Sequence, residues 1–306
     1  MHRHWTQAIT HLWGVDAHLT PLAGEADLNF KAHVNEGQDF LLKVMHLDCT
    51  AELVEMQCQA LAHIKAASPT LPIPQVIPTL SGDLFTTTED RAGQARIVWA
   101  IEFMPGQLYA EFKPQTSSLV ADLGIKLARL NKALLDFQHP ALSREFPWHL
   151  MQARWIEAHT DVIDNPQQRA LIQSICDDYA ALDDGLAELP SGPIHNDIND
   201  YNLLVEASLT TDSTITGIID FGDMCRAPRI CELAIAGAYL VLDHDDPIGI
   251  LESFVAAYHR ESPLIAMEID ALYCLLRMRL AVSLVTSSQA HKARPVSYTH
   301  LTLPTN

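Results

Sequence analysis

The hydrophobic pattern of the chain changes near Phe103, and this change limits the folds that the sequence can adopt. Before this point, short apolar or alternating runs are bounded by turn residues, which is typical of β-strands. After Thr116, apolar residues recur every three or four positions, which is typical of amphipathic helices. Residues 104–106 (Met-Pro-Gly) lie where the pattern changes and predict a hinge. The sequence therefore predicts two lobes, at 1–103 and 104–290.

The N-terminal half predicts a small antiparallel sheet and one main helix. Predicted strands cover 28–34, 40–45, 84–88 and 96–103. The first two are joined by a turn at 36–39, which is a hairpin signature. A helix with apolar residues at i, i+3 and i+4 spacing runs from Ala51 to about Ala66. Asp48 or Thr50 supplies the capping chemistry at its start.

The C-terminal half predicts helices interrupted by two short strands. Helical patterns begin at Thr116 and also cover 148–159, 166–189, 230–242, 247–260 and 263–285. The strands are expected at 203–205 and 215–219. Residues 295–306 have no helical period, and they resemble translated adapter read-through more than a natural terminus. We therefore interpret 291–306 as a non-native tail, with a genuine flexible tail as the alternative.

The composition excludes several classes of protein. No apolar run approaches the ~20 residues of a membrane span, and the N-terminus lacks the apolar region of a secretion signal, so we expect a cytoplasmic protein without membrane contact. The six cysteines lack CxxC spacing and are interpreted as free thiols rather than disulfides or a zinc site. A formal net charge of −18 disfavours nucleic-acid binding and suits a small cationic substrate.

A polar loop at 193–202 carries the strongest chemical signal in the sequence. Asp197 and Asn202 lie in this loop, and the strand that follows the next turn delivers Asp220 at its end. Gly222 then allows the chain to turn sharply. Carboxylate and amide oxygens suit Mg²⁺, which typically takes one or two carboxylates plus substrate phosphates. A separate carboxylate, Asp197, is then left to orient or deprotonate a hydroxyl group.

These motifs form the pattern HxDxxxxN followed by a DFG strand end, which resembles the catalytic and metal loops of kinases. The strings LLKV, HNDINDYN and IIDFGD together resemble the aminoglycoside phosphotransferase/choline kinase family. EADLNF, HNDINDYN and DFGDM with CELAIA are similar to its hydroxylysine kinase-like branch. The resemblance runs from about Leu19 to Ala290. It implies an α+β, bilobal protein-kinase-like fold, with a small antiparallel-sheet N-lobe containing one main helix and a larger, mostly helical C-lobe.

The resemblance implies roles for four residues of the two loops. Asp197 would be the catalytic base or the residue that orients the acceptor hydroxyl, and His195 would brace the catalytic loop. Asn202 and Asp220 would hold Mg²⁺ against the phosphates of the nucleotide. The expected cofactor is therefore Mg²⁺, with ATP or GTP as the co-substrate.

The resemblance also implies that Lys43, in an apolar strand, contacts the nucleotide phosphates. A carboxylate on the next helix would pair with this lysine and stop it from swinging away. Glu55 is the first choice for that carboxylate, and Glu52 is the fallback. The alternative for Lys43 is a side chain that snorkels at a sheet edge.

Two further segments would complete the nucleotide site. The chain from Gly24 to Asn29 would form the turn over the nucleotide, although it carries a single glycine rather than a GxGxxG loop. The stretch 101–104, which includes Glu102 and Met104, would line the pocket for the base.

Several other polar residues keep two interpretations. Asp200 and Asn199 either take a direct role or brace the loop. Asp223 is either a second acidic contact or a cap of the following segment. Glu232 either anchors the helix that begins near Ile230 or braces the catalytic loop.

Two groups of residues are candidates for binding an ammonium group. The acidic group lies between two predicted helices and comprises Asp243, Asp245 and Asp246. The aromatic group comprises Trp148, Trp155 and Tyr239. The alternatives are a solvated acidic loop that caps the next helix and an ordinary aromatic core.

The expected function is a small-molecule kinase that transfers the γ-phosphoryl group of ATP or GTP to a hydroxyl of an amino alcohol or a hydroxylysine-like amino acid. The alternatives are an aminoglycoside O-phosphotransferase, a homoserine, choline or ethanolamine kinase and, outside enzymes, a nucleotide-binding module. Only about ten residues separate Asp220 from the helix near Ile230, so an activation segment does not fit and protein substrates are not expected. In this branch, bacterial relatives can form the first domain of longer chains with an aminotransferase domain, and the resemblance allows the same here.

Overall fold

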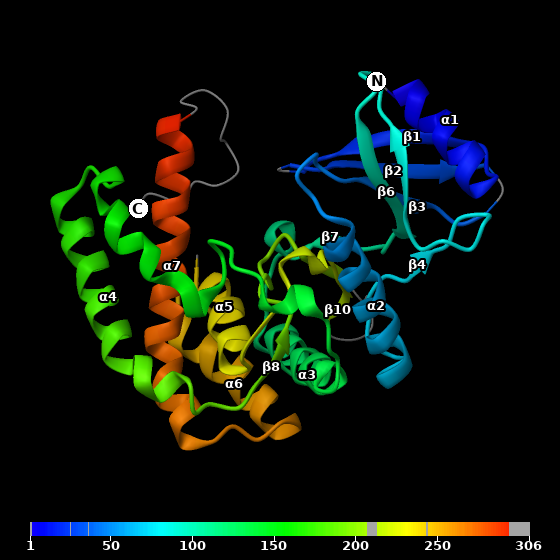
Figure 1. Ribbon diagram of the computed structural model, residues 1–306. Helices are drawn as coiled ribbons and strands as arrows, with labels where there is room; N and C mark the ends of the chain where they lie inside the picture. Colours follow the sequence, from blue (N-terminus) through cyan, green and yellow to red (C-terminus); the bar gives the residue numbers. More distant parts are fainter. Residues whose placement is uncertain (1, 25, 36, 207–212, 243, 294–306) are drawn as a thin grey trace. The chain divides into compact units, whose positions relative to one another are not determined.

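In a computed structural model, the chain forms two compact units (Figure 1). The structure describes residues 2–24, 26–35, 37–206, 213–242 and 244–293. The first unit combines Met1–Phe112 with Leu203–Gly222, and the second combines Lys113–Asn202 with Asp223–Asn306. This division differs from the predicted boundary after residue 103, because the chain folds back and residues 203–222 join the N-terminal unit.

A six-stranded antiparallel sheet forms the frame of the first unit. Its strands are β1 (Ala17–Leu22), β2 (Leu28–Val34), β3 (Phe40–Val44), β4 (Val76–Ile77), β5 (Thr86–Glu89) and β6 (Ala95–Glu102). The order is β1-β2-β3-β6-β4, with β5 also paired to β6. The four predicted strands are confirmed to within two residues at each end, and the β2–β3 hairpin places Asn29 opposite Lys43.

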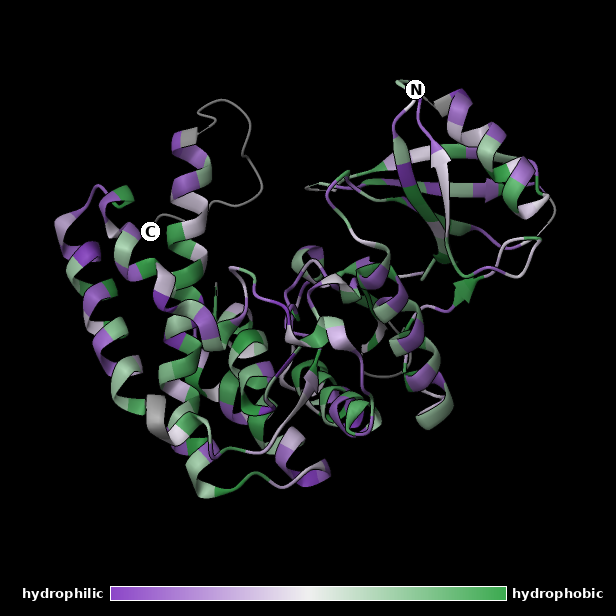
Figure 2. Ribbon diagram, viewed as in Figure 1, coloured by the Kyte–Doolittle hydropathy of each residue, from purple (hydrophilic) through white to green (hydrophobic). Residues whose placement is uncertain are grey.

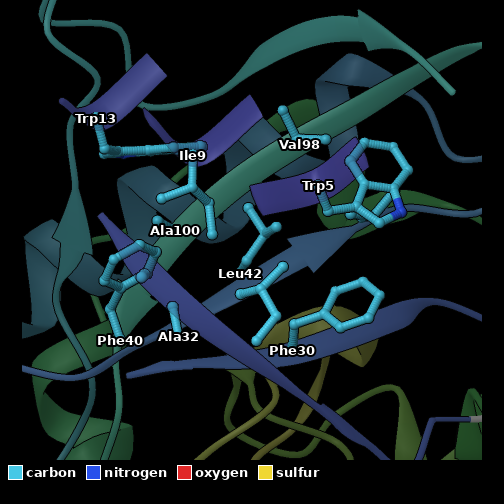
Figure 3. Packing of buried hydrophobic residues seen from close by; sticks show 12 residues of the cluster. Trp5, Ile9, Trp13, Phe30, Ala32, Phe40, Leu42, Val98 and Ala100 are labelled. Atoms are coloured by element: carbon cyan, nitrogen blue, oxygen red, sulfur yellow. The ribbon is translucent and has the colours of Figure 1, made fainter. Parts of the chain in front are cut away.

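A helix that the sequence analysis did not predict covers this sheet. Helix α1 (His2–Trp13) presents Trp5, Ile9 and Trp13 at a spacing of four residues, and all three are buried. They pack with Phe40, Leu42 and other sheet residues in one hydrophobic cluster (Figure 3). The first unit therefore contains α1 in addition to the predicted helix. A hydrophobic core of this unit lies between α1 and the sheet.

The predicted helix of this unit is α2 (Ala51–Ala67), which begins where capping chemistry was expected. Thr50 is the N-cap, and its hydroxyl accepts the backbone N–H of Leu53 at 3.3 Å. A second sheet in the same unit has the order β10-β9-β7. Its strands are β7 (Gln107–Leu108), β9 (Leu203–Glu206) and β10 (Thr214–Ile218), and the short 3₁₀ helix η1 (Tyr109–Glu111) follows β7. The backbone N–H of Ile218 donates to the carbonyl of Pro72 at 2.8 Å, which ties this sheet to the rest of the unit.

The second unit is mainly helical. Its helices are α3 (Ser117–Leu134), α4 (Pro166–Leu186), α5 (Ile230–Leu240), α6 (Pro247–Glu261) and α7 (Ala266–Ala293). It also contains the 3₁₀ segments η2 (Pro140–Ser143) and η3 (Leu150–Val162), and β8 (Ser191–Ile194) pairs with β11 (Cys225–Pro228). A short 3₁₀ turn, η4 (Phe221–Asp223), links the two units along the chain.

The segment predicted as a helix at 148–159 has 3₁₀ geometry. Its buried residues are Leu150, Ala153 and Ile156, and their spacing of three matches the three residues per turn of a 3₁₀ helix. The last helix also differs from its prediction, because α7 begins at Ala266 rather than 263 and continues to Ala293.

Helix α5 lies in the interior of the second unit. Ten of its eleven residues are buried, and Figure 2 colours the helix mainly green, for hydrophobic residues. A helix that is apolar on all sides is expected in an interior position. Its one charged residue, Glu232, is therefore carried into the centre of the unit, where it needs hydrogen-bond partners.

Helices α3 and α6 approach each other closely at Gly124. A Cβ atom at this position would collide with the carbonyl oxygen of Phe254 and lie 3.1 Å from the Cβ of Ala257. Because the obstacle is backbone, the helices would have to separate to admit a side chain. Among the described residues, no helix is both long enough and apolar enough to cross a membrane.

We expect Gly124→Ala to lower the free energy of unfolding by about 1–3 kcal/mol, the usual cost of overpacking. Gly185→Ala in α4 is the matched control, because a Cβ there meets nothing within 4 Å. The control should be neutral or stabilising by up to about 1 kcal/mol, since alanine favours helix over glycine. Urea unfolding of both variants checks this, and equal effects would contradict the packing described for Gly124.

Candidate active site

The side chain of Asp197 is fixed by three hydrogen-bond donors in the second unit. Its Oδ1 accepts from Asn199 Nδ2 at 3.0 Å and from Arg279 Nη2 at 3.0 Å. Its Oδ2 accepts from Asn202 Nδ2 at 2.7 Å. The side chain remains 24% exposed. The carboxylate is therefore held in one orientation while part of it stays accessible to a ligand.

The loop that carries Asp197 is braced by Glu232 of α5. The Glu232 carboxylate accepts the backbone N–H of His195 at 2.6 Å and that of Asn196 at 3.0 Å. It also accepts from Asn131 Nδ2 at 3.3 Å, and the hydroxyl of Tyr258 donates to Asn131 Oδ1 at 2.9 Å. Of the two interpretations of Glu232, the structure therefore shows the brace of the loop.

Burial raises the pKa of the Glu232 carboxyl to about 7, against the opposing effect of the N–H groups of His195 and Asn196. His195 is fully buried, and its Nδ1 accepts the backbone N–H of Asp197 at 3.2 Å. The buried imidazole therefore accepts a hydrogen bond from the loop itself, and its bracing role stays a prediction.

Two residues of the polar loops have left-handed backbone conformations. Asn196 has φ 67° and Asp220 has φ 64°. Positive φ is uncommon outside glycine, although asparagine and aspartate adopt it more readily than other residues. Such conformations persist where the surroundings hold them, and they gather at functional sites. Asn196 belongs to the HNDINDYN motif in the second unit, and Asp220 belongs to the DFG motif in the first unit.

Arg279 of α7 is a site residue that the sequence analysis missed. Its side chain is 2% exposed and contacts Asp197. The guanidinium lies 4.6 Å from the ring centroid of Trp148 and 5.6 Å from that of Tyr239. Two of the three aromatic residues considered for an ammonium group therefore stack on a cation of the protein itself. The third, Trp155, donates its Nε1–H to the carbonyl of Pro147 at 2.9 Å.

In the first unit, Lys43 and Asp220 form an ion pair. Lys43 Nζ lies 3.1 Å from Asp220 Oδ1, and the lysine side chain is 6% exposed whereas that of the aspartate is 50% exposed. The buried position of Lys43, in the centre of the sheet on β3, differs from that of a lysine that snorkels at an edge. The amine is thus brought to the strand end that carries the DFG aspartate.

The predicted pairing of Lys43 with Glu55 is wrong. Glu55 is exposed and accepts a hydrogen bond from Gln59 Nε2 at 3.0 Å, and Glu52 is also exposed. The reason is the phase of α2, whose buried face includes Val54, Met56, Gln57 and Cys58. The helix therefore turns both carboxylates toward solvent.

Gln57 is the polar side chain that α2 buries instead. It is 1% exposed, and its Nε2 donates to the carbonyl of Leu53 at 3.3 Å. A Cβ atom built on Gly222 would lie 4.0 Å from Gln57 Oε1 and 3.4 Å from Asp220 Oδ1. An amide rather than a carboxylate thus faces the DFG turn. A polar residue at a core position of the helical pattern was the signal that could have found it.

Gly24 lies close to Asp27 and Asn29. A Cβ atom at Gly24 would lie 2.7 Å from Asn29 Nδ2 and 2.7 Å from the carbonyl oxygen of Asp27. Asp27 also accepts from the backbone N–H and the Nδ1 of His46, at 2.8 and 2.9 Å. Asn29 Oδ1 is buried and has no hydrogen-bond partner among the described residues. An unpaired buried polar atom beside Lys43 on the neighbouring strand is the condition that a polar ligand would relieve.

The pocket for the base at 101–104 stays a prediction. Glu102, at the end of β6, accepts from the backbone N–H and the Nε2 of Gln75, both at 3.1 Å. The adjacent Met104 is half-buried. The Glu102 carboxylate is therefore engaged with its neighbouring segment.

The acidic candidates for substrate binding lie at different places in the second unit. Asp200 is half-buried in the catalytic loop, and Asp223 lies 3.8 Å from Arg144 Nη2. Asp245 is exposed, and Asp243 lies outside the described residues. Their neighbour Asp246 caps α6 by accepting the backbone N–H of Gly249 at 2.9 Å, as the capping alternative expects.

Replacing Glu232 by glutamine should change how stability depends on pH. The pKa of Glu232 rises from 4.5 to about 7 on folding, so its stabilising contribution is complete below pH 4.5 and is lost as the pH rises through about 7. The free energy of unfolding of Glu232→Gln minus that of the wild type should therefore increase between these pH values. Urea unfolding across this range checks the sign, with Glu252→Gln, on the exposed face of α6, as the control for loss of one charge. A difference that is constant or falls with pH would contradict the assignment.

The sequence of the chain is similar to a known family and to known enzymes. Residues 18–268 match the family described as the phosphotransferase enzyme family. A hydroxylysine kinase from Danio rerio is 30% identical over 302 residues, which cover 93% of this chain and 82% of the relative. The similarity to hydroxylysine kinases that the motifs indicated is thus confirmed over most of the chain.

Two solved structures show the same fold. An amicoumacin kinase in complex with AMP-PNP, Ca²⁺ and Ami aligns with a TM-score of 0.74 at 16% identity, over 96% of this chain and 88% of that one. A microcompartment-associated aminopropanol kinase aligns with a TM-score of 0.70 at 24% identity, over 98% and 99% of the two chains. The predicted α+β, protein-kinase-like fold is therefore confirmed. The chain belongs to the phosphotransferase enzyme family and is an enzyme that transfers phosphoryl groups to hydroxyl groups.

Proposed function

We propose that this enzyme transfers the γ-phosphoryl group of ATP or GTP to the hydroxyl of a small cationic amino alcohol or of a hydroxylysine-like amino acid. The observation that carries the proposal is the Asp197 carboxylate, which Asn199, Asn202 and Arg279 fix in one orientation while a quarter of it stays exposed. A carboxylate held in this way can accept a hydrogen bond from a hydroxyl group and align its oxygen with a phosphorus atom.

The nucleotide is assigned to the first unit. Lys43 supplies a buried cation for the phosphates. On the neighbouring strand, the unpaired amide oxygen of Asn29 offers an acceptor for a hydroxyl or amino group of the nucleotide. The space at Gly24 excludes a side chain, because a Cβ atom there would collide with Asp27 and Asn29. Buried positive charge is the chemistry that a polyphosphate requires.

Asn202 and Asp220 are proposed as ligands of a divalent metal ion, Mg²⁺. The Nδ2 of Asn202 is committed to Asp197, so the oxygen of this amide is the atom that remains for a cation. Asp220 contributes a half-exposed carboxylate. Both are hard oxygen donors, which fit Mg²⁺. When bound, the metal ion would neutralise negative charge on the transferring phosphoryl group.

In the reaction, the acceptor oxygen forms a bond to the γ-phosphorus while the bond between this phosphorus and the bridging oxygen of the β-phosphate breaks. The nucleoside diphosphate leaves, and the hydroxyl proton is released by way of Asp197. Lys43 holds the phosphates in place by its charge. No covalent phosphoenzyme is required.

The acceptor class follows from what two relatives share. 5-Hydroxylysine contains a secondary hydroxyl next to an aminomethyl group. The same pair of groups is present in 1-amino-2-propanol, one of the isomers that the name aminopropanol covers. The formal net charge of −18 attracts such ammonium-bearing molecules. We therefore infer that the enzyme accepts 1-amino-2-alcohols.

The proposal is tested by release of nucleoside diphosphate with Mg²⁺ and ATP or GTP. The acceptors are 5-hydroxylysine, 1-amino-2-propanol, ethanolamine, choline, homoserine and aminoglycosides, and lysine is the control that lacks only the hydroxyl of 5-hydroxylysine. We expect release with the first two acceptors and none with lysine, and a loss of about 10²–10⁴-fold in Asp197→Ala. Preferred turnover of aminoglycosides would favour the resistance-type alternative. Nucleotide-induced thermal stabilisation without release would favour the nucleotide-binding module.

Lys43 and Glu55 should respond differently to substitution. Lys43→Met should lower kcat/KM for the nucleotide by about 10²–10³-fold, because a buried cation aimed at developing charge is removed. Glu55→Gln should leave it unchanged, because Glu55 is exposed and bonded to Gln59. Steady-state kinetics of the two variants make the measurement. A large loss in Glu55→Gln would restore the pairing that the structure contradicts.

A further inference from the structure

We propose that Arg279 is a positioning residue for phosphoryl transfer, which acts by fixing the direction of the Asp197 carboxylate. This inference rests on the proposed function, because that function assigns the acceptor hydroxyl to Asp197. Arg279 lies on α7, 82 residues from the catalytic loop along the chain, and belongs to none of the loops that carry the family's motifs.

The contact between Arg279 and Asp197 lies within one unit and is short. Arg279 Nη2 donates to Asp197 Oδ1 at 3.0 Å, and the two side chains are 2% and 24% exposed. A buried guanidinium needs a compensating anion and hydrogen-bond acceptors. Arg279 donates to the carboxylate of Asp197, and the charge of Asp223 also acts on the guanidinium. One edge of the arginine is therefore directed to Asp197 rather than to solvent.

Two aromatic rings and two further hydrogen-bond acceptors surround the guanidinium. Its centre lies 4.6 Å from the ring centroid of Trp148 and 5.6 Å from that of Tyr239. Its Nε donates to the Tyr239 hydroxyl at 3.2 Å, and its Nη1 donates to the carbonyl of Trp148 at 3.2 Å. The Tyr239 hydroxyl in turn lies 3.1 Å from Ser283 Oγ. A planar guanidinium with two aromatic rings and three hydrogen-bond acceptors around it is a rigid support for one oxygen of Asp197.

The same support reaches the residue before Asp197. The carbonyl of Trp148 also accepts a hydrogen bond from Asn196 Nδ2, at 3.3 Å. Asn196 has the left-handed backbone that directs the chain into Asp197. Arg279 and Asn196 therefore share one acceptor, which couples the position of α7 to the backbone of the loop as well as to its carboxylate.

This arrangement assigns two tasks to the three donors on Asp197. Asn199 and Asn202 belong to the same loop as Asp197 and move with it. Arg279 instead connects the Asp197 carboxylate to helix α7, which lies outside the loop. A displacement of about 1 Å in a reacting group can cost about 10²-fold in rate. Loss of Arg279 should therefore lower kcat by about 10²-fold. The KM for the nucleotide should not change, because the nucleotide is assigned to Lys43 and its neighbours.

A double-mutant cycle tests the inference. Acceptor phosphorylation by the full chain is measured for the wild type, Arg279→Met, Asp197→Asn and the double variant. If Arg279 acts through Asp197, Arg279→Met lowers kcat about 10²-fold in the wild type and has little effect in Asp197→Asn. Arg277→Met is the matched control. Arg277 lies two residues before Arg279 on α7, on another side of the helix, and pairs with Asp178 at 2.7 Å. It should leave kcat unchanged.

Equal losses of kcat in both backgrounds would overturn the inference, because a structural role of Arg279 does not depend on Asp197. So would a loss confined to the KM for the nucleotide. Thermal unfolding shows whether Arg279→Met folds, and if it does not, Arg279→Lys carries the same cycle, with a kcat between those of the wild type and the inactive variants. Absence of acceptor phosphorylation by the folded wild type would instead overturn the proposed function, so the two failures are distinguishable.

Discussion

The loop that carries Asp197 depends on a carboxylate that is buried in the interior of the second unit. Glu232 enters this interior because α5 is apolar on every side, and there it accepts the backbone N–H groups of His195 and Asn196. An ionised carboxyl group is costly to bury, and the pKa of about 7 expresses that cost. The gain is a loop whose backbone is fixed immediately before Asp197.

A buried cation also contacts this loop. Arg279 contacts Asp197 directly, and its charge also acts on Glu232 and lowers the pKa of that carboxyl. Burial opposes the charge of Arg279, but Tyr239 and Asp197 outweigh this effect and raise the pKa of its guanidinium. The loop is thus held between an anion from α5 and a cation from α7. Buried charges of opposite sign, each with hydrogen-bond partners, are a way of specifying one geometry where apolar packing alone would leave several.

The sequence was sufficient to predict what depends on local pattern. The strands β2 and β3, the helix α2 with its Thr50 cap, and the two polar loops follow from alternation, helical spacing and turn chemistry. The prediction of Glu55 is wrong because it considers only the charge of the side chain. The positions of the apolar residues in α2 place Gln57 on the buried face and Glu55 on the exposed face. The contact of Arg279 with Asp197 could not be predicted from local sequence patterns, because the two residues are 82 positions apart in the chain. Helix α1 was detectable, since Trp5, Ile9 and Trp13 repeat every four residues.

The central claim is that Asp197 receives the hydroxyl of the acceptor. A crystal structure of the enzyme with a non-hydrolysable nucleotide, Mg²⁺ and 5-hydroxylysine tests it most directly. We expect the acceptor hydroxyl within about 2.5–3.0 Å of an Asp197 carboxylate oxygen, the range of an O–H···O hydrogen bond. We also expect the carboxylate to remain bonded to Arg279. An acceptor hydroxyl bound away from Asp197, with another side chain next to it, would show that Asp197 does not have this role.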